Sequence, residues 1–286
     1  VDMYVKCGML GKAEEVIKEL PLQNVVSWSS LITGYAHHRQ CYEALSCYEQ
    51  MRGEGLCPNM VTFVSILKAC ASIGSLEVGE ELHAKVSEQG ILFGKKNIVV
   101  ATALIDMYAK CGALQRAWEV FDGLSQRDIV SWNTLIMACS RYGYVEEAFC
   151  LFKRLSLARL EPNHITFLSI LKGKSLEIGL NSGMQIHAYA IQYGLESNRL
   201  VGNSLISMYV KCSVLAKAQE VFDEIHVRDV VSWNALLSGY SQHGFGHESL
   251  SLFPAMQEQG LLPDEVTFSC LLKACSTIGS ISEGQK

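Results

Sequence analysis

Apolar residues recur at helical spacing along the chain. Between residues 25 and 37 they occupy positions i, i+3, i+4, i+7 and i+8, in the order Trp28, Leu31, Ile32, Tyr35 and Ala36. This is the stripe that an amphipathic helix buries. Second stripes recur at 117–124 and 218–225, and Phe121 and Phe222 occupy the same place in them. The pattern therefore predicts pairs of helices with one buried face each.

The stripes belong to a longer repeat. A 35-residue unit occurs three times, and its tryptophans Trp28, Trp132 and Trp233 lie 104 and then 101 residues apart. Two other recurring units separate the copies. Such short helix pairs cannot bury both stripes alone, so neighbouring pairs must stack. We therefore expect an all-α fold, an α-solenoid of helix-turn-helix repeats in one array over 1–286. Its predicted boundaries are 1–24 (partial), 25–59, 60–97, 98–128, 129–163, 164–198, 199–229, 230–264 and 265–286 (partial).

Composition narrows the class of protein. Apolar residues make up 49% of the chain and charged residues 19%, which is typical of a well-buried globular chain. The net charge of −5 argues against binding polyanions by bulk electrostatics. Eleven cysteines without a CxxC motif predict free thiols in a reducing compartment. The longest apolar run, 98–105, is too short to span a membrane. The chain begins in mid-repeat at Val1, so we expect further sequence before it.

Local signals mark where the helices begin and where one is disturbed. A serine or threonine stands just before each first stripe, where an N-cap is wanted, and we expect these residues to be the caps: Ser27, Thr62, Ser131, Thr166, Ser232 and Thr267. Pro254 falls inside a second helix. It is expected to kink or shorten that helix, at a cost of roughly 3 kcal/mol if unrelieved.

Short polar residues form a separate band on the first helices. The fifth residue of five units is Ser29, Thr102, Asn133, Asn203 or Asn234, and Lys110, Arg141 and Lys211 follow two turns later. Hydroxyl and amide groups at regular intervals suit base edges of a single-stranded nucleic acid. The alternative is that Ser, Thr and Asn merely favour the first turn of a helix. The pattern alone leaves both interpretations open.

Signals for catalysis are weak. His83 and His187 share one repeat position on an apolar helix, which favours packing histidines over acids or metal ligands. His243 and His247 have a metal-like spacing, but Gly244 and Gly246 interrupt the helix that this site needs. We predict no catalytic residue, no metal site and no cofactor, and therefore no enzyme.

Several motifs together point to a family. SWNxLI, LIxMYxKCG, AxxVFD, RDVVSW and TFxSxLKAC resemble the pentatricopeptide-repeat (PPR) proteins of the plant PLS class, whose P, L and S units follow one another in this order. The resemblance covers essentially the whole chain and departs from the family pattern at 91–97, at 173–183 and at Pro254. It implies a right-handed superhelix that binds single-stranded RNA, one nucleotide per repeat, with its N-terminus toward the RNA 5′ end.

The resemblance also implies residue roles. The fifth and last residues of a repeat select the base: Ser29 with Asn59 for adenine, Thr102 with Asp128 for guanine, Asn133 with Asn163 for a pyrimidine, preferably cytosine, and Asn203 with Asp229 and Asn234 with Asp264 for uracil. The second residues sandwich the base, and these are Val26, Val99, Val130, Leu200 and Val231. Val64 with Asn97 and Leu168 with Asn198 receive no base, so the expected target is 5′-A-n-G-Y-n-U-U-3′. Lys110, Arg141 and Lys211 are the expected phosphate contacts.

By this resemblance we expect a monomeric RNA-recognition module of a C-to-U editing factor in a mitochondrion or chloroplast, acting with other editing or processing factors. RNA processing, splicing or stability is the alternative within the same class. A protein-binding scaffold is the alternative outside it, because helical solenoids also hold peptides. Such a peptide groove should show recurring aromatic or charged clamps instead of alternating Ser, Thr and Asn.

Overall fold

The computed structural model describes residues 1–20, 23–91, 98–171, 173 and 179–279. Within these residues the chain forms α-helices and no strand, so the all-α prediction is confirmed. The helices fall into two compact units, Val1–Ala138 and Cys139–Lys286.

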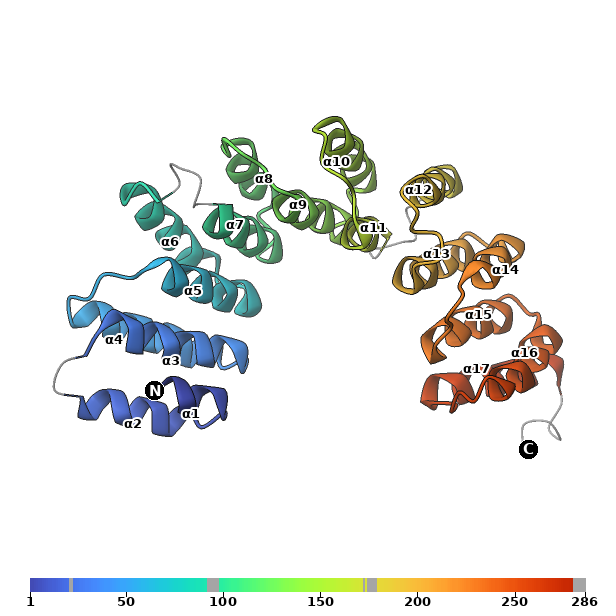
Figure 1. Cartoon of the computed structure of the whole chain (residues 1–286), viewed down its shortest axis with the longest axis horizontal. Coiled ribbons are helices and arrows are strands. Elements are labelled where there is room, and N and C mark those ends of the chain that lie inside the picture. The colour runs from blue at the N-terminus through green and yellow to red at the C-terminus, as the bar shows by residue number, and fades with distance from the viewer. Residues whose placement is uncertain (21–22, 92–97, 172, 174–178, 280–286) are drawn as a thin grey trace. The chain divides into compact units, whose positions relative to one another are not determined.

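The first unit is built from helix pairs in two layers. The first helices of successive pairs pack on one another, α1 on α3, α3 on α5 and α5 on α7, while α2, α4, α6 and α8 form a second layer (Figure 1). Each second helix covers the stripe of its own first helix. The helices are α1 (Asp2–Lys6), α2 (Leu10–Glu19), α3 (Val25–His37), α4 (Cys41–Gly53), α5 (Met60–Ile73), α6 (Leu76–Glu88), α7 (Ile98–Lys110), α8 (Leu114–Asp122) and α9 (Ile129–Arg141), whose last turn belongs to the second unit.

The second unit repeats the arrangement. Helix α11 packs on α13, α13 on α15 and α15 on α17, and the helices between them lie in the other layer. Their bounds are α10 (Val145–Leu157), α11 (His164–Leu171), α12 (Leu180–Gln192), α13 (Arg199–Lys211), α14 (Leu215–Glu224), α15 (Val230–Gln242), α16 (Gly246–Glu258) and α17 (Glu265–Ile278). Both units thus present a layer made of first helices.

The recurrent RDVVSW stretch joins one repeat to the next. Arg228 donates hydrogen bonds from Nε to the Phe222 carbonyl (2.9 Å) and from an Nη to that of Asp223 (2.9 Å), which satisfies the open end of α14. Its guanidinium also lies 4.6 Å from the centre of the Phe222 ring, and that ring meets Trp233 edge-on at 4.8 Å. Arg127, Phe121 and Trp132 make the same set of contacts in the first unit. These contacts therefore fix the orientation of α15 relative to α14, and that of α9 relative to α8.

First helices approach each other closely at a glycine. A Cβ atom on Gly239 of α15 would lie 2.5 Å from Cγ2 of Val210 of α13. Gly34 of α3 occupies the same place against Val5 of α1, where the distance would be 2.6 Å. Glycine at this position lets the first layer pack tightly, so side chains near it are held in fixed positions.

Pro254 does not shorten its helix. Helix α16 runs through Pro254 and has 13 residues, as α4 and α10 have in the equivalent repeats. The expectation of a shorter helix was therefore wrong. Pro254 is exposed, so its ring lies at the surface of the helix. The kink that was expected as the alternative stays a prediction.

Some expectations lie outside what the structure describes. Residues 92–97 of the predicted insertion, with Asn97, and residues 174–178 of the divergent stretch 173–183 are not among the described residues. The hand of the superhelix stays a prediction. None of the described helices has the length and apolar character needed to cross a membrane.

Candidate nucleic-acid interface

Wherever the structure describes it, the Asn or Asp that ends a repeat is the N-cap of the next helix. Asn59 Oδ1 accepts a hydrogen bond from the Thr62 backbone N (2.9 Å), and Asp264 Oδ1 accepts one from that of Thr267 (2.9 Å). The threonine hydroxyl in turn accepts a hydrogen bond from the backbone N–H of the N-cap residue, which completes a capping box at both helices. Asp128, Asn163 and Asp229 accept from Ser131, Thr166 and Ser232 in the same way.

The predicted N-caps were therefore wrong by three residues. Thr62, Ser131, Thr166, Ser232 and Thr267 stand at the third helical position, and Asn24 instead of Ser27 caps α3. The Asn or Asp side chain reaches the free backbone N–H groups from outside the helix, which the Ser or Thr cannot do from within it.

The structure brings the fifth and last residues of two repeats into direct contact. Asn234 donates from Nδ2 to Asp264 Oδ1 at 2.8 Å, and Asn203 donates to Asp229 Oδ1 at 3.4 Å. Thr267 Oγ1 also lies 2.7 Å from Asn234 Oδ1 as a donor. The capping box therefore orients the amide of the fifth residue as well as the carboxylate of the last.

The remaining predicted pairs are placed differently. Ser29 and Asn59 are linked through the Thr62 hydroxyl, which lies 2.7 Å from Ser29 Oγ and donates to Asn59 Oδ1 at 3.1 Å. Asn133 lies in the first unit and Asn163 in the second, so the pairing of these two stays a prediction.

Burial separates the two kinds of predicted site residue. The fifth residues are recessed, with Ser29, Asn133, Asn203 and Asn234 less than a tenth exposed and Thr102 half-buried. The second residues stand out from the first-helix layer and are all exposed, namely Val26, Val99, Val130, Leu200 and Val231. The recessed fifth residues are therefore flanked by exposed apolar side chains, while the last residues are half-buried or, in Asp264, exposed.

In the first unit these groups line one cavity. A space of about 290 Å³ is bounded by Val99 and Val130, with Thr102 and Asp128 among its polar walls. Thr102 Oγ1 donates to the Ile98 carbonyl at 2.6 Å, which fixes its rotamer. The two residues predicted to select a base and the two predicted to sandwich it therefore meet at one place.

The second unit has a matching cavity of about 340 Å³. Leu200 and Val231 bound it as Val99 and Val130 bound the first, and Asn203 takes the place of Thr102. Leu168 lines it from the preceding helix, as Val64 does in the first unit. The same repeat positions thus form a slot in both units.

Hydrogen bonds keep the carboxylates of the interface ionised. The Thr267 backbone and the Asn234 amide lower the pKa of Asp264. Burial opposes ionisation of Asp229, but hydrogen bonds from Ser232 and the charge of Arg199 outweigh it, so its pKa is also lowered. Both side chains are therefore acceptors at neutral pH.

Comparison with known proteins agrees with this architecture. A model described as the PPR repeat family matches residues 23–72, 127–174 and 228–277, and a PPR repeat model matches 1–25, 99–129 and 203–230. The first of these alone accounts for more than half of the chain.

The chain belongs to the PPR repeat family.

Curated relatives and solved structures extend the likeness. A mitochondrial pentatricopeptide repeat-containing protein of Arabidopsis thaliana is 36% identical over 286 residues, covering 100% of this chain and 37% of the relative. A chloroplastic one from the same plant is 36% identical over 278 residues, covering 97% and 45%. The crystal structure of the pentatricopeptide repeat protein PPR10 in complex with an 18-nucleotide psaJ RNA element matches with a TM-score of 0.73 at 20% identity, over 99% of this chain and 42% of that one.

The structural match confirms the α-solenoid fold. This PPR chain spans between about a quarter and a half of the length of the curated relatives it matches.

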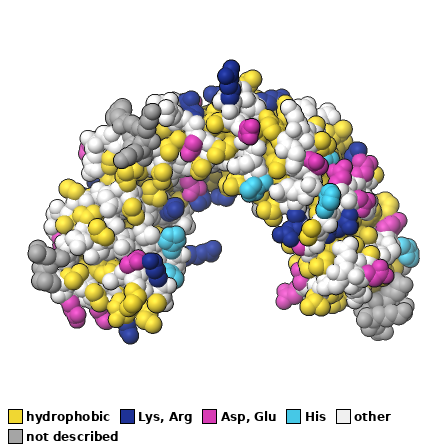
Figure 2. Space-filling model, viewed as in Figure 1, with side chains coloured by type: hydrophobic (Ala, Val, Ile, Leu, Met, Phe, Trp, Pro, Cys, Tyr) yellow, Lys and Arg dark blue, Asp and Glu magenta, His cyan; other side chains and the backbone are white. Residues whose placement is uncertain are grey.

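The basic residues of the PPR repeats differ in their surroundings. Lys110 is ion-paired with Asp106 at 2.7 Å, which offsets part of its charge. Lys211 lines the second slot, and Arg141 is exposed at the end of α9. In the face shown in Figure 2, basic and acidic side chains are scattered among apolar and uncharged ones, so no broad basic surface appears there.

Sequence reasoning missed Lys68. This exposed side chain of α5 lines the first slot, and among the described residues its ammonium has no ion-pair or hydrogen-bond partner. It is the cation best placed for a phosphate beside that slot. The signal was present, because Lys273 has the same place in the third copy of this unit.

The second residues of the units 60–97, 164–198 and 265–286 were also missed. Val61, Ile165 and Val266 are exposed to about the same degree as the predicted sandwiching residues. Their position in the repeat could have identified them.

The two recurrent histidines are packing residues, as predicted. His83 Nδ1 lies 2.8 Å from the Tyr108 hydroxyl and His187 Nδ1 lies 2.9 Å from that of Tyr209. Burial lowers the pKa of both imidazoles. His243 ends α15 and is followed by Gly244 at φ 86°, which confirms the predicted helix break before His247.

Proposed function

We propose that this PPR chain binds single-stranded RNA in a sequence-specific manner, with one base for each repeat. The observation that carries the proposal is the slot that recurs in both units. In each, two projecting aliphatic side chains flank a recessed polar residue, as Val99 and Val130 flank Thr102 and as Leu200 and Val231 flank Asn203.

The slot fits an unstacked base chemically. Exposed aliphatic side chains on both sides can pack against the two faces of a base, which single-stranded RNA offers and a duplex does not. The polar fifth residue, with the Asn or Asp that ends the repeat, would present donors and acceptors to its edge. Because two hydrogen-bonding groups act on one base, each repeat contributes roughly 1–3 kcal/mol of discrimination.

The charge of the chain is consistent with binding at individual slots. With a net charge of −5 the chain has no general attraction for polyanions, so binding depends on single cations near the slots. Lys68 and Lys211 line the two slots, whereas Lys110 and Arg141 are not among the residues that line either slot. We therefore assign phosphate contact chiefly to Lys68 and Lys211.

The names of similar proteins support the same proposal. The PPR10 structure contains a psaJ RNA element, and the names of relatives place them in mitochondria or chloroplasts. The resemblance to the PLS class favours a protein that directs C-to-U editing in one of these organelles. In this proposal the repeats recognise RNA and carry no catalytic group.

Binding to short RNAs tests the proposal. Fluorescence anisotropy would compare an RNA containing 5′-A-n-G-Y-n-U-U-3′ with one in which the A and the G are exchanged. The proposal predicts at least about tenfold tighter binding to the first, since two positions are mismatched in the second. Equal affinity for both RNAs would contradict base reading in this register. No binding by a folded sample would favour the protein-binding scaffold.

A further inference from the structure

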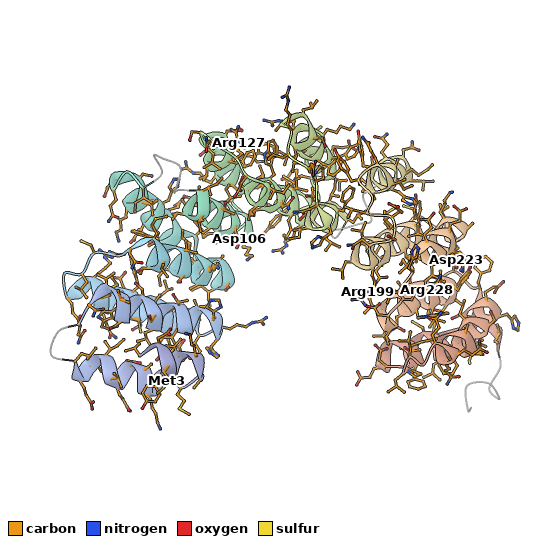
Figure 3. The ribbon with its side chains drawn as sticks, in the orientation of Figure 1. Met3, Asp106, Arg127, Arg199, Asp223 and Arg228 are labelled. Atoms are coloured by element: carbon orange, nitrogen blue, oxygen red, sulfur yellow. The ribbon has the colours of Figure 1, made fainter. Side chains whose placement is uncertain are left out.

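One repeat carries a charged residue where its neighbours carry an aliphatic one. The first residue is Val25, Ile98, Ile129 or Val230 in the other units that have a polar fifth residue, but it is Arg199 in the unit 199–229. Arg199 Nε lies 3.2 Å from Oδ2 of Asp229, the last residue of the same repeat. Figure 3 shows Arg199 on the side of α13 away from α14.

This ion pair leaves both carboxylate oxygens of Asp229 with protein partners. Oδ1 accepts from the Ser232 backbone N and Oγ, both at 2.9 Å, and from Asn203 Nδ2 at 3.4 Å. Oδ2 accepts from Arg199. Each oxygen of the Asp229 carboxylate therefore already has at least one hydrogen-bond or ion-pair partner within the protein.

The next repeat provides a matched comparison. It has the same Asn and Asp pair, and Asp264 Oδ1 accepts from Thr267 N, Thr267 Oγ1 and Asn234 Nδ2. Val230 stands in the place of Arg199, and within the described part of the chain no cation pairs with Asp264. The Asn234 amide is also closer to its carboxylate, at 2.8 Å, than the Asn203 amide is at 3.4 Å. The two repeats share the Asn and Asp pair but differ in the charge of the first residue, Arg199 against Val230, and in the aliphatic second residue, Leu200 against Val231.

The difference affects how a pyrimidine edge can be read. Uracil presents N3–H as a donor, whereas cytosine has an acceptor at N3 and a donor at N4. A carboxylate that no cation engages can accept the uracil N3–H and so favours uracil. An arginine side chain has hydrogen-bond donors only. Arg199 therefore occupies the carboxylate oxygen that would accept the uracil N3–H, and its N–H groups can donate to the acceptor atoms of uracil or cytosine alike.

We propose that Arg199 is a specificity-determining residue that makes the repeat 199–229 discriminate less between uracil and cytosine than the repeat 230–264. The inference rests on the proposed RNA binding. It adds that two repeats with the same pair of base-selecting residues differ in stringency. Arg199 is about half exposed, so its replacement should leave the helix intact.

The test uses two reciprocal variants, Arg199→Val and Val230→Arg, with thermal unfolding to show that each is folded. Binding is measured to the expected RNA and to two derivatives with U changed to C at one of the last two positions. In the unchanged protein, U over C preference should be at least about fivefold weaker at the 199–229 position than at the 230–264 position. Arg199→Val should raise the first preference by that factor and leave the second unchanged, and Val230→Arg should lower the second.

Each other outcome has a definite meaning. If Arg199→Val binds RNA with an unchanged U over C ratio, the inference is overturned and the proposed function stands. If it weakens binding to all three RNAs equally, Arg199 contacts phosphate and the inference is again overturned. If the unchanged, folded protein binds none of the RNAs, the proposed function fails and the inference fails with it.

Discussion

Replacing Asn59 separates the two roles of the residue that ends a repeat. Its Oδ1 caps α5 through the Thr62 backbone N at 2.9 Å, and the same side chain is predicted to select a base with Ser29. Asn59→Ala removes both functions. Asn59→Asp keeps an oxygen acceptor for the cap and changes the group presented to the base. Asn59→Ala should therefore lose the preference for adenine and lower stability. Asn59→Asp pairs a hydroxyl with a carboxylate, as Thr102 and Asp128 do, so it should shift the preference toward guanine and keep the cap.

The structure sets the size of the difference. Loss of an Asn cap costs about 1 kcal/mol, within a range of roughly 0.5–2. The Thr62 hydroxyl is fully buried, but it keeps Ser29 Oγ as a partner at 2.7 Å, so no buried polar group is left unpaired. We therefore expect Asn59→Ala to lower the free energy of unfolding by about 1–2 kcal/mol. Asn59→Asp should leave it unchanged or raise it by up to about 1 kcal/mol, because a negative charge at a helix N-terminus is favourable.

Urea unfolding followed by circular dichroism measures the global effect, and hydrogen exchange of the Thr62 amide measures the local one. Stability in a solenoid depends on contacts between neighbouring repeats, so the loss should be concentrated at α5. A loss of 1.4 kcal/mol corresponds to about tenfold faster exchange at that amide. If Asn59→Ala unfolds at the same urea concentration as the unchanged protein and protects Thr62 equally, the cap does not stabilise α5 and the reasoning is refuted.

Three further predictions concern single sites. Lys68→Gln should weaken binding to all RNAs alike and reduce the slope of log affinity against log salt by about 1, while Lys12→Gln on α2 should change neither. Pro254→Lys should raise the free energy of unfolding by up to about 3 kcal/mol in thermal or urea unfolding, because it restores a backbone hydrogen bond in α16; an unchanged value would mean that the helix has already accommodated the ring. Burial lowers the pKa of His83 and His187, so the unfolded state takes up protons first and stability should fall as the pH drops below about 6.5. Replacing both by glutamine should flatten urea stability between about pH 7 and pH 5, above the range in which carboxylates titrate.

The helices could be predicted from the sequence because their stripes are strong and recur. Trp28, Trp132 and Trp233 are all buried, and each lies in a first helix as the spacing indicates. The caps were misassigned because Asn or Asp and Ser or Thr are all good cap formers and stand three residues apart. A capping box uses both, and only the backbone geometry shows which lies outside the helix.

The details of the slots depend on contacts between helices, which the pattern along one helix does not contain. That Lys68 of α5 reaches the slot of the following repeat follows from how α5 packs on α7. The pairing of Arg199 with Asp229 likewise joins residues 30 positions apart, at the start of α13 and at the N-cap of α15. The sequence alone shows only that Arg199 stands at a repeat position that is aliphatic in the other units with a polar fifth residue.

Changing the fifth residue of a single repeat tests the central claim most directly. Thr102 shares a slot with Asp128, and Thr102→Asn would give this repeat the same pair that 199–229 and 230–264 carry. Binding of the unchanged and variant proteins would be measured to two RNAs that differ only in G or U at the third position of 5′-A-n-G-Y-n-U-U-3′. Base reading by repeat predicts that the unchanged protein prefers G and that the variant prefers U, each by about tenfold. A variant that folds, binds RNA and keeps the preference of the unchanged protein would contradict the account.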